Sequence, residues 1–360
     1  MDVKLIAFNL PQFHPIPEND EWWGKGFTEW TNTAKAKPLF TGHYQPHVPA
    51  DLGFYDLRLP ESRKAQADMA RAYGIEAFCY YHYWFAGKRL LERPVNEIIE
   101  SGEPDFPFCL CWANDTWSGI WHGTPKHILV EQTYPGYDDY KAHFDYLLKA
   151  FSDRRYLTID GKPLFVVYQP YHMPDPKYFA ELFRELAEKA GLKGLYLIAL
   201  NTPKGWVPAD FGFDASIGTR LPQLRKLLWV PRRNPIKRIY HKYLNLAGKP
   251  TIHSYEKVML EMFYESKHGS VSYPCVIPNW DNTPRLGSNG LVLHGSTPDL
   301  FRQHLRKAID MVRDKHFEHK LIFIKSWNEW AEGNHLEPDL RFGTGYLDVV
   351  REEVRRCMEG

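Results

Sequence analysis

The chain has 360 residues, and its 45 Lys and Arg nearly balance its 44 Asp and Glu, which leaves a formal net charge of +1 at pH 7. This balance gives no overall attraction to a polyanion, so it argues against a nucleic-acid partner. Hydrophobic residues make up 44% of the chain and charged residues 25%, a composition typical of a folded globular protein and not of a disordered one.

Eight short apolar runs, many of them rich in β-branched or aromatic residues, are typical of buried parallel strands. They cover residues 4–10, 77–83, 108–112, 164–168, 195–200, 215–218, 273–277 and 321–326. Helical patterns lie between several of them, at 59–73, 137–151, 177–190 and 297–313, the last with Thr297 as the predicted N-cap before Pro298. Strands that alternate with helices predict an α/β fold, a (β/α)8 TIM-type barrel that forms one catalytic domain over residues 1–360.

The alternative to the barrel is a doubly wound open sheet. Such a sheet usually has a glycine-rich nucleotide loop after its first strand. Here the first strand runs into Asn9-Leu10-Pro11-Gln12-Phe13-His14, which has no glycine. Two long connections, at about residues 11–60 and 219–255, are expected to be insertions at the carboxyl-terminal rim of the barrel.

Cysteine use and apolar patterning predict the compartment. Five cysteines without a Cys-x-x-Cys pair are typical of a reducing environment. Cys109 and Cys111 lie two apart in one apolar run, so we expect them to pack as small apolar groups on one face of a strand. The chain as given has neither a leader pattern nor an apolar stretch long enough to span a membrane, which predicts a cytoplasmic protein.

Polar and aromatic residues gather at the ends of the predicted strands. In a barrel these ends share one rim, where active sites lie. We therefore predict substrate binding by the residues that follow the first, second, third and seventh strands: Asn9, Gln12, His14, His82, Tyr83, Trp84, Asn114, Asp115, Trp117, Trp280 and Asp281. Two structural alternatives stay open, a helix N-cap with a core tryptophan at 114–117 and a purely structural histidine at 82.

The densest polar cluster follows the last strand, between residues 326 and 338. It contains Glu329, Glu332 and Glu337 beside two tryptophans. Cleavage of a glycosidic bond needs two proton-handling groups, and two carboxyl groups suffice once their environments separate their pKa values. Glu329 and Glu332, three residues apart, share one face if the segment is helical. The alternative is a first helical turn with acids that only complement the helix dipole.

The predicted catalytic pair is therefore Glu329 and Glu332. The neighbouring residues Asn328, Trp330, His335 and Glu337 are predicted to bind substrate. The histidines of the chain show no metal-ligand spacing such as His-Glu-x-x-His, so we expect neither a catalytic metal nor a cofactor.

Five motifs together resemble the WbsX-like family, which is related to glycoside hydrolase family 99 and is often encoded with bacterial surface-polysaccharide genes. They are Phe8-Asn9-Leu10-Pro11-Gln12-Phe13-His14-Pro15, Gly26-Phe27-Thr28-Glu29-Trp30, Tyr80-Tyr81-His82-Tyr83-Trp84-Phe85, Cys111-Trp112-Ala113-Asn114-Asp115 and Trp327-Asn328-Glu329-Trp330-Ala331-Glu332-Gly333. The resemblance covers nearly the whole chain. It implies retaining chemistry through a 1,2-anhydro sugar, in which Glu329 deprotonates the sugar 2-hydroxyl and Glu332 protonates the leaving oxygen.

The same resemblance implies a glycan or lipid-linked oligosaccharide substrate from O-antigen, lipopolysaccharide or capsule metabolism. Two alternatives remain. One is a glycosyltransferase with a nucleotide-sugar or lipid-linked donor, although the chain has no Asp-x-Asp motif and no glycine-rich loop. The other is a noncatalytic carbohydrate-binding protein, which the intact pair of glutamates argues against.

Residues 219–255 contain nine Lys or Arg and no Asp or Glu, interleaved with apolar residues such as Trp229 and Ile236. Basic residues beside apolar ones are typical of a segment that contacts an anionic membrane surface. This pattern gives the hypothesis of a peripheral contact with the inner membrane. A solvated basic loop and direct binding of an acidic sugar or phosphate are the alternatives.

Overall fold

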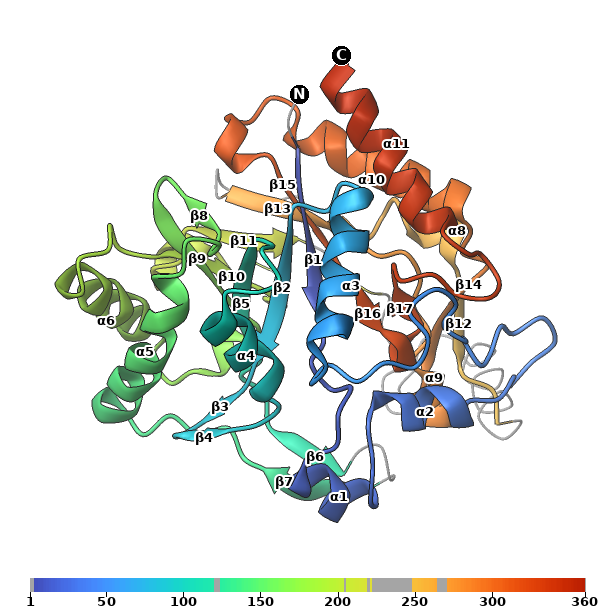
Figure 1. Cartoon of the computed structure of the whole chain (residues 1–360), viewed down its shortest axis with the longest axis horizontal. Helices are drawn as coiled ribbons and strands as arrows, with labels where there is room; N and C mark the ends of the chain where they lie inside the picture. Colours follow the sequence, from blue (N-terminus) through green and yellow to red (C-terminus); the bar gives the residue numbers. More distant parts are fainter. Residues whose placement is uncertain are drawn as a thin grey trace, which may run out of the picture.

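Eight parallel strands close into a barrel (Figure 1). The computed structural model describes residues 3–119, 124–203, 205–218, 221, 248–263 and 271–359. In chain order the barrel strands are β1 (Lys4–Asn9), β2 (Ala77–His82), β5 (Phe108–Trp112), β9 (Lys162–Val167), β10 (Tyr196–Ala199), β11 (Ala215–Gly218), β13 (Val271–Val276) and β15 (Leu321–Ile324). The pairings β15–β1 and β9–β10 complete the ring. The predicted barrel and its eight predicted strands are confirmed.

Helices surround the barrel and lie between most of its strands (Figure 1). The longer ones are α3 (Pro60–Ala72), α4 (Arg93–Ser101), α5 (Tyr137–Phe151), α6 (Pro176–Lys189), α10 (Pro298–Val312) and α11 (Gly345–Glu359). Short helices are α1 (Pro17–Trp23), α2 (Glu29–Lys35), α8 (Tyr255–Val258) and α9 (Thr283–Leu286), and 3-10 turns span Pro170–His172, Pro208–Phe211, Gly287–Asn289, Phe317–His319 and Trp330–Glu332. The four predicted helices correspond to α3, α5, α6 and α10.

Short strands decorate the barrel. They are β3 (Trp84–Phe85), β4 (Lys88–Arg89), β6 (Trp117–Gly119), β7 (Thr124–Val130), β8 (Thr158–Ile159), β12 (Thr251–Ser254), β14 (Leu291–His294), β16 (Asn328–Glu329) and β17 (Asn334–His335). Four pairs of them form small ribbons of their own, β3–β4, β6–β7, β12–β14 and β16–β17, whereas β8 pairs with β9.

Helix α10 illustrates why these segments are helical. The Thr297 hydroxyl accepts a hydrogen bond from the Leu300 amide, and Pro298 occupies the first turn, as predicted. Phe301, Leu305 and Ala308 recur at helical spacing and are fully buried against the barrel.

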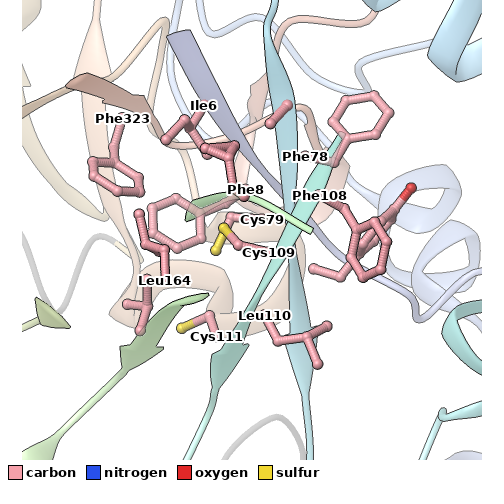
Figure 2. Close-up of a cluster of buried hydrophobic side chains, with 14 of the residues drawn as sticks. Ile6, Phe8, Phe78, Cys79, Phe108, Cys109, Leu110, Cys111, Leu164 and Phe323 are labelled. Carbon is pink, nitrogen blue, oxygen red and sulfur yellow. The ribbon is translucent and has the colours of Figure 1, made fainter. Parts of the chain in front are cut away.

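The core fills the interior of the barrel and the layer between its strands and the surrounding helices, and Figure 2 shows a part of it. Ile6, Phe8 and Phe323 meet Cys79 and other side chains from β2 and β5, and all of them are buried. Cys109 and Cys111 are buried thiols without a disulfide, as expected from their spacing. The barrel interior is therefore packed closed below the rim, which is where barrel enzymes bind their ligands.

The rim at the carboxyl ends of the strands carries most of the additional structure. In Figure 1 the arrows of β1 and β2 point toward the end of the molecule where α1, α2 and the β6–β7 ribbon lie. Helices α1 and α2 belong to the predicted insertion at 11–60. Of the predicted basic insertion, residues 219, 220 and 222–247 lie outside the described residues, and 251–254 form β12. None of the helices in the described ranges is long and apolar enough to cross a membrane.

Candidate active site

A cavity of about 320 Å³ opens at the carboxyl-terminal rim of the barrel. It is lined by carboxylates, two basic side chains and an aromatic wall. The lining residues are Leu10, Gln12, Trp23, Tyr81, Tyr83, Ala113, Asp115, Thr116, Trp117, Ser118, Tyr168, Arg285, Lys325, Glu329 and Glu332. The predicted catalytic pair thus lies in one cavity with Gln12, Tyr83, Asp115 and Trp117 from the predicted binding set.

The segment that carries the two glutamates is not an α-helix, so the expectation of a shared helical face is wrong. Glu329 ends the short strand β16, and Glu332 ends the following 3-10 turn. Gly333 then adopts a left-handed conformation with φ of 57°, and a Cβ atom there would lie 2.9 Å from the Cβ atom of Asp281. Only glycine fits this turn without strain, and the turn aims both carboxyl groups into the cavity from one short loop.

Glu329 is surrounded by groups that favour its ionised form. The Lys325 Nζ atom donates to Glu329 Oε2 at 2.9 Å and to the Tyr81 hydroxyl at 3.1 Å. Burial alone would raise the pKa of Glu329, but the charges of Lys325 and Arg285 and a hydrogen bond from Glu332 outweigh it, and the pKa lies below its ordinary value. Glu329 is therefore the ionised member of the pair at neutral pH.

The pKa of Glu332 is shifted in the opposite direction, above its ordinary value. Its burial and the adjacent charge of Glu329 raise its pKa to about 8, although Arg285 and Lys325 act against that rise. Arg285 Nη1 lies 2.5 Å from Glu332 Oε1, and Lys325 Nζ lies 3.9 Å from Glu332 Oε2. A protonated carboxyl group still accepts a hydrogen bond through its carbonyl oxygen. The arginine contact at Oε1 is thus compatible with a protonated Glu332 that forms a hydrogen bond with Glu329.

A third glutamate anchors the arginine. Glu29, which is fully buried at the start of α2, accepts a hydrogen bond from Arg285 Nη2. Arg285 lies on α9 and therefore joins the N-terminal insertion to the loop that carries Glu332. Burial raises the pKa of Glu29 despite the nearby arginine charge. The guanidinium group is held between two carboxyl groups and cannot turn away from Glu332 without breaking a buried ion pair.

Aromatic side chains form part of the cavity wall. Trp117 lies against Trp22, Tyr83 and Phe85, with ring centroids 6.0, 5.0 and 5.8 Å away. Flat apolar rings of this kind pack against the C–H faces of sugars, and their fixed position costs little entropy on binding. Within the described residues, the Gln12 Nε2 atom is buried and has no protein partner, so it can donate to a ligand hydroxyl.

Several predicted binding residues instead hold in place the catalytic loop, the segment 326–338 that carries the predicted catalytic pair. Asn328 Oδ1 accepts from the Leu10 amide at 2.7 Å, and Asn328 Nδ2 donates to Asn9 Oδ1 at 3.3 Å. Glu337 accepts from Trp330 Nε1 at 2.7 Å. The His335 ring stacks on the Trp330 ring, with centroids 3.8 Å apart. These side chains, like His14, are buried and do not line the cavity.

The remaining predicted binding residues also lie outside the cavity lining. His82 Nε2 lies 2.8 Å from His143 Nε2 of α5, Trp84 Nε1 donates to Asp139 and Asn114 Nδ2 donates to Tyr134. Asp281 is hydrogen-bonded to His43, Gln45 and Thr283, whereas the Trp280 ring lies 5.6 Å from Lys325 Nζ. Their contacts are structural ones that support the rim.

Sequence reasoning missed Lys325, Arg285, Glu29, Tyr81 and Tyr168. A signal existed for Lys325, because a charged residue ends an otherwise apolar barrel strand. No local signal marks Arg285. The described residues also contain one group that could hold a metal ion, His47, His335 and Asp339, and it lies outside the cavity lining.

Comparisons with known proteins agree with this architecture. Residues 5–350 match the family model described as glycosyltransferase WbsX. The uncharacterized protein WxcX of Xanthomonas campestris pv. campestris strain B100 is 37% identical over 358 residues, which cover 99% of this chain but 50% of WxcX. This chain thus spans about half the length of that relative.

Among solved structures, a family-99 endo-α-mannosidase of Bacteroides thetaiotaomicron has a TM-score of 0.59 at 15% identity and covers 100% of this chain and 99% of its own. A glycoside hydrolase-like protein has a TM-score of 0.57 at 16% identity, with 98% and 94% of the two chains covered. At these identities the likeness concerns the fold.

Proposed function

The chain belongs to the WbsX glycosyltransferase family, and from this membership we propose that it is a carbohydrate-active enzyme that makes or breaks glycosidic bonds in bacterial surface-polysaccharide metabolism. The observation that carries the proposal is the divergence of two adjacent carboxyl groups. Lys325 keeps Glu329 ionised, while burial and Glu329 keep Glu332 protonated up to about pH 8. Two groups in opposite protonation states are what acid–base cleavage of a glycosidic bond requires.

In the proposed first step, Glu329 takes the proton of the sugar 2-hydroxyl. The 2-oxygen attacks the anomeric carbon, the glycosidic bond breaks, and Glu332 protonates the departing oxygen. The products are a 1,2-anhydro sugar and the released alcohol, with Glu329 now protonated and Glu332 ionised. Lys325 and Arg285 then compensate the transferred charge, because each contacts one of the two carboxyl groups.

In the second step, Glu332 takes a proton from an incoming hydroxyl, which attacks the anomeric carbon. The 2-oxygen leaves and recovers its proton from Glu329, so both carboxyl groups return to their initial states. Two displacements at one carbon give overall retention. If the incoming hydroxyl is water, the enzyme is a hydrolase, and if it is another sugar, the enzyme is a transferase.

The transferase is the second candidate because the matching family model is described as a glycosyltransferase. Its donor would be a nucleotide sugar or a lipid-linked sugar. A noncatalytic carbohydrate-binding protein is the third possibility, and the paired glutamates with diverging pKa values argue against it.

One experiment distinguishes these functions. The protein is incubated separately with labelled nucleotide sugars and with manno- or rhamno-configured oligosaccharides, and mass spectrometry identifies the products. Hydrolysis releases shortened glycans, transfer gives extended ones, and a binding protein gives neither. A 2-deoxy analogue of the accepted sugar tests the mechanism, because it lacks the 2-oxygen nucleophile. Turnover of this analogue at the normal rate would refute the anhydro-sugar route.

The proposed substrate is a glycan, free or lipid-linked, and the proposed location is the cytoplasm with peripheral contact to the inner membrane through residues 219–255. This part of the proposal rests on sequence alone, since nine basic residues without an acid favour an anionic surface. Cosedimentation with anionic vesicles at low and high salt tests it. The contact requires salt-sensitive binding that weakens when Arg232, Arg233, Lys237 and Arg238 are changed to Ser. No binding at low salt would refute it.

A further inference from the structure

Three buried side chains converge beside the catalytic loop, outside the cavity. His47 Nδ1 lies 2.9 Å from His335 Nε2, and His335 Nε2 lies 3.9 Å from Asp339 Oδ2. All three ligand atoms lie within 4.8 Å of one another. His47, His335 and Asp339 are 4%, 6% and 4% exposed, so water can do little to solvate their polar atoms.

The hydrogen bonds of the group fix which atoms carry lone pairs. The Nδ1 atom of His335 lies 2.8 Å from the carbonyl oxygen of Glu337 and must donate to it. The other ring nitrogen of His335, Nε2, faces His47 Nδ1 and Asp339 Oδ2. A neutral His335 that donates through Nδ1 presents a lone pair at Nε2. The hydrogen bond between the two rings then needs a proton on His47 Nδ1, which a bound metal ion would replace.

We propose that His47 Nδ1, His335 Nε2 and Asp339 Oδ2 bind one Zn²⁺ ion. Zinc–nitrogen and zinc–oxygen bonds of about 2.0–2.2 Å in a tetrahedron place the ligand atoms roughly 3.3 Å apart. Two of the three observed separations, 2.9 and 3.9 Å, bracket this value and the third is within 4.8 Å, so movements of the side chains would complete the geometry. His47 also lines a cavity of about 50 Å³, which has room for a water molecule.

The surroundings of the group are those of metal ligands. A histidine that binds a metal usually donates its other ring N–H to a carbonyl or carboxylate, as His335 does to Glu337. The second carboxylate oxygen of Asp339, Oδ1, accepts from the amides of Arg341 and Phe342 at 2.9 and 2.7 Å. These bonds orient the carboxylate, which also has a hydrogen bond with the side chain of Tyr44.

The ion would fasten the N-terminal insertion to the catalytic loop. His47 belongs to the insertion, and backbone hydrogen bonds join the same two segments, from Leu340 to Val48 and from Ala50 to Pro338, both at 2.9 Å. The His335 ring stacks on Trp330, which lies between the two catalytic glutamates in the sequence. The role of the ion is therefore to stabilise the loop, and the inference stands independently of the proposed reaction.

The test measures zinc binding by the full chain without an affinity tag. The protein is treated with a chelator, dialysed and titrated with ZnCl₂ by calorimetry, and its metal content is measured by mass spectrometry. One equivalent is expected to bind and to raise the melting temperature. His47→Gln and Asp339→Asn should each weaken binding by at least about 100-fold, because loss of an outer partner alone costs about 10–100-fold.

The matched control is His143→Gln. His143 forms a second buried histidine pair with His82, with Nε2 atoms 2.8 Å apart. Within the described residues, no carboxylate joins this pair to make a group of three possible metal ligands. This variant should bind zinc like the parent chain. Failure of the parent chain to take one equivalent, or equally tight binding by Asp339→Asn, would overturn the proposal.

If the variants fail to fold, cobalt substitution of the parent chain decides. A tetrahedral Co²⁺ spectrum without thiolate charge transfer supports two imidazoles and a carboxylate. Thiolate bands would instead assign the metal to the cysteines, and an octahedral spectrum would indicate unspecific binding. Either result refutes the site.

Discussion

Replacement of Lys325 by Met removes the charge that keeps Glu329 ionised and preserves the length of the side chain. The ammonium group lies 2.9 Å from Glu329 and 3.9 Å from Glu332, so the change acts mainly on Glu329. At an effective dielectric constant of about 20, opposite charges 2.9 Å apart attract by about 6 kcal/mol. Part of this energy offsets the desolvation of the lysine itself, and an opposite charge at such range usually lowers a carboxyl pKa by about 1–3.

The sign of the effect on catalysis follows from the two roles. In the proposed mechanism activity needs Glu329 ionised, so the rate is expected to fall as the pH drops through the lowered pKa of Glu329. It also needs Glu332 protonated, so the rate falls as the pH rises through the pKa of Glu332, about 8. Lys325→Met should raise the pKa of Glu329 and so shift the acid limb of the kcat/KM profile to higher pH by about 1–3 units. The alkaline limb should shift to higher pH by less, because Lys325 lies farther from Glu332 than from Glu329.

The assay is the pH profile of kcat/KM on the substrate found by product analysis, with ¹³C NMR titration of the glutamate carboxyl groups as a readout that needs no substrate. Lys149→Gln is the control, since this exposed lysine on α5 has a solvated partner. An unchanged acid limb together with an unchanged Glu329 titration would refute the assignment of Lys325 as the group that holds the base ionised.

Three further predictions concern the same cavity. Glu329→Gln and Glu332→Gln should each lower kcat by about 10²–10⁴-fold with the fold intact by circular dichroism. The control is Glu181→Gln, an exposed residue of α6, which should keep its activity. Near-normal rates in both catalytic variants would contradict the assignment. Trp117→Ala should weaken substrate binding by about 1 kcal/mol, roughly a fivefold rise in KM at constant kcat, and a loss confined to kcat would exclude a stacking role. Glu29→Gln removes one carboxylate of the buried ion pair with Arg285, so chemical denaturation should show a free energy of unfolding lower by about 3–5 kcal/mol. The Arg285 charge would then act more strongly on Glu332, so the alkaline limb of the pH profile should move to lower pH. An alkaline limb that stays in place would show that Glu29 does not act through Glu332.

The barrel could be predicted because its signals are local. Each strand is an apolar run that is buried on both faces, and such runs stand out against the polar connections. The N-cap at Thr297 and the periodic apolar residues of α10 likewise need only neighbouring residues to be recognised. The order in which the strands close into a ring follows from the general rule for βα units and needs no further information.

The conformation of the catalytic loop could not be predicted, because polar side chains there compete with helical hydrogen bonds. Ser326 Oγ accepts from the Glu329 amide at 2.9 Å and donates to the Asn334 carbonyl at 2.7 Å. Gly333 in its left-handed conformation then reverses the chain against Asp281. Spacing by three residues suggested a helix, whereas these tertiary contacts formed a short ribbon and a turn.

Some rim residues line the cavity and others face the surrounding helices. The alternation of side chains along each strand distinguishes the two. Side chains two residues apart point to the same face of a strand. Cys79 lies inside the barrel (Figure 2), and Tyr81 and Tyr83, which continue its face of β2, line the cavity. His82 points the other way and meets His143 on α5.

The same parity holds at other strands. Phe8 in the barrel interior is followed by Leu10 and Gln12 in the cavity, and Cys111 is followed by Ala113. Phe323 is followed two residues later by Lys325, so the inward face of the last strand ends in a positive charge next to the catalytic loop. A search for polar residues at strand ends therefore finds the rim, but a search restricted to the inward parity finds the cavity, and it would have identified Lys325 from the sequence. The polarity of outward residues such as His82 serves contacts with the helices outside the barrel, so it is no signal of a substrate.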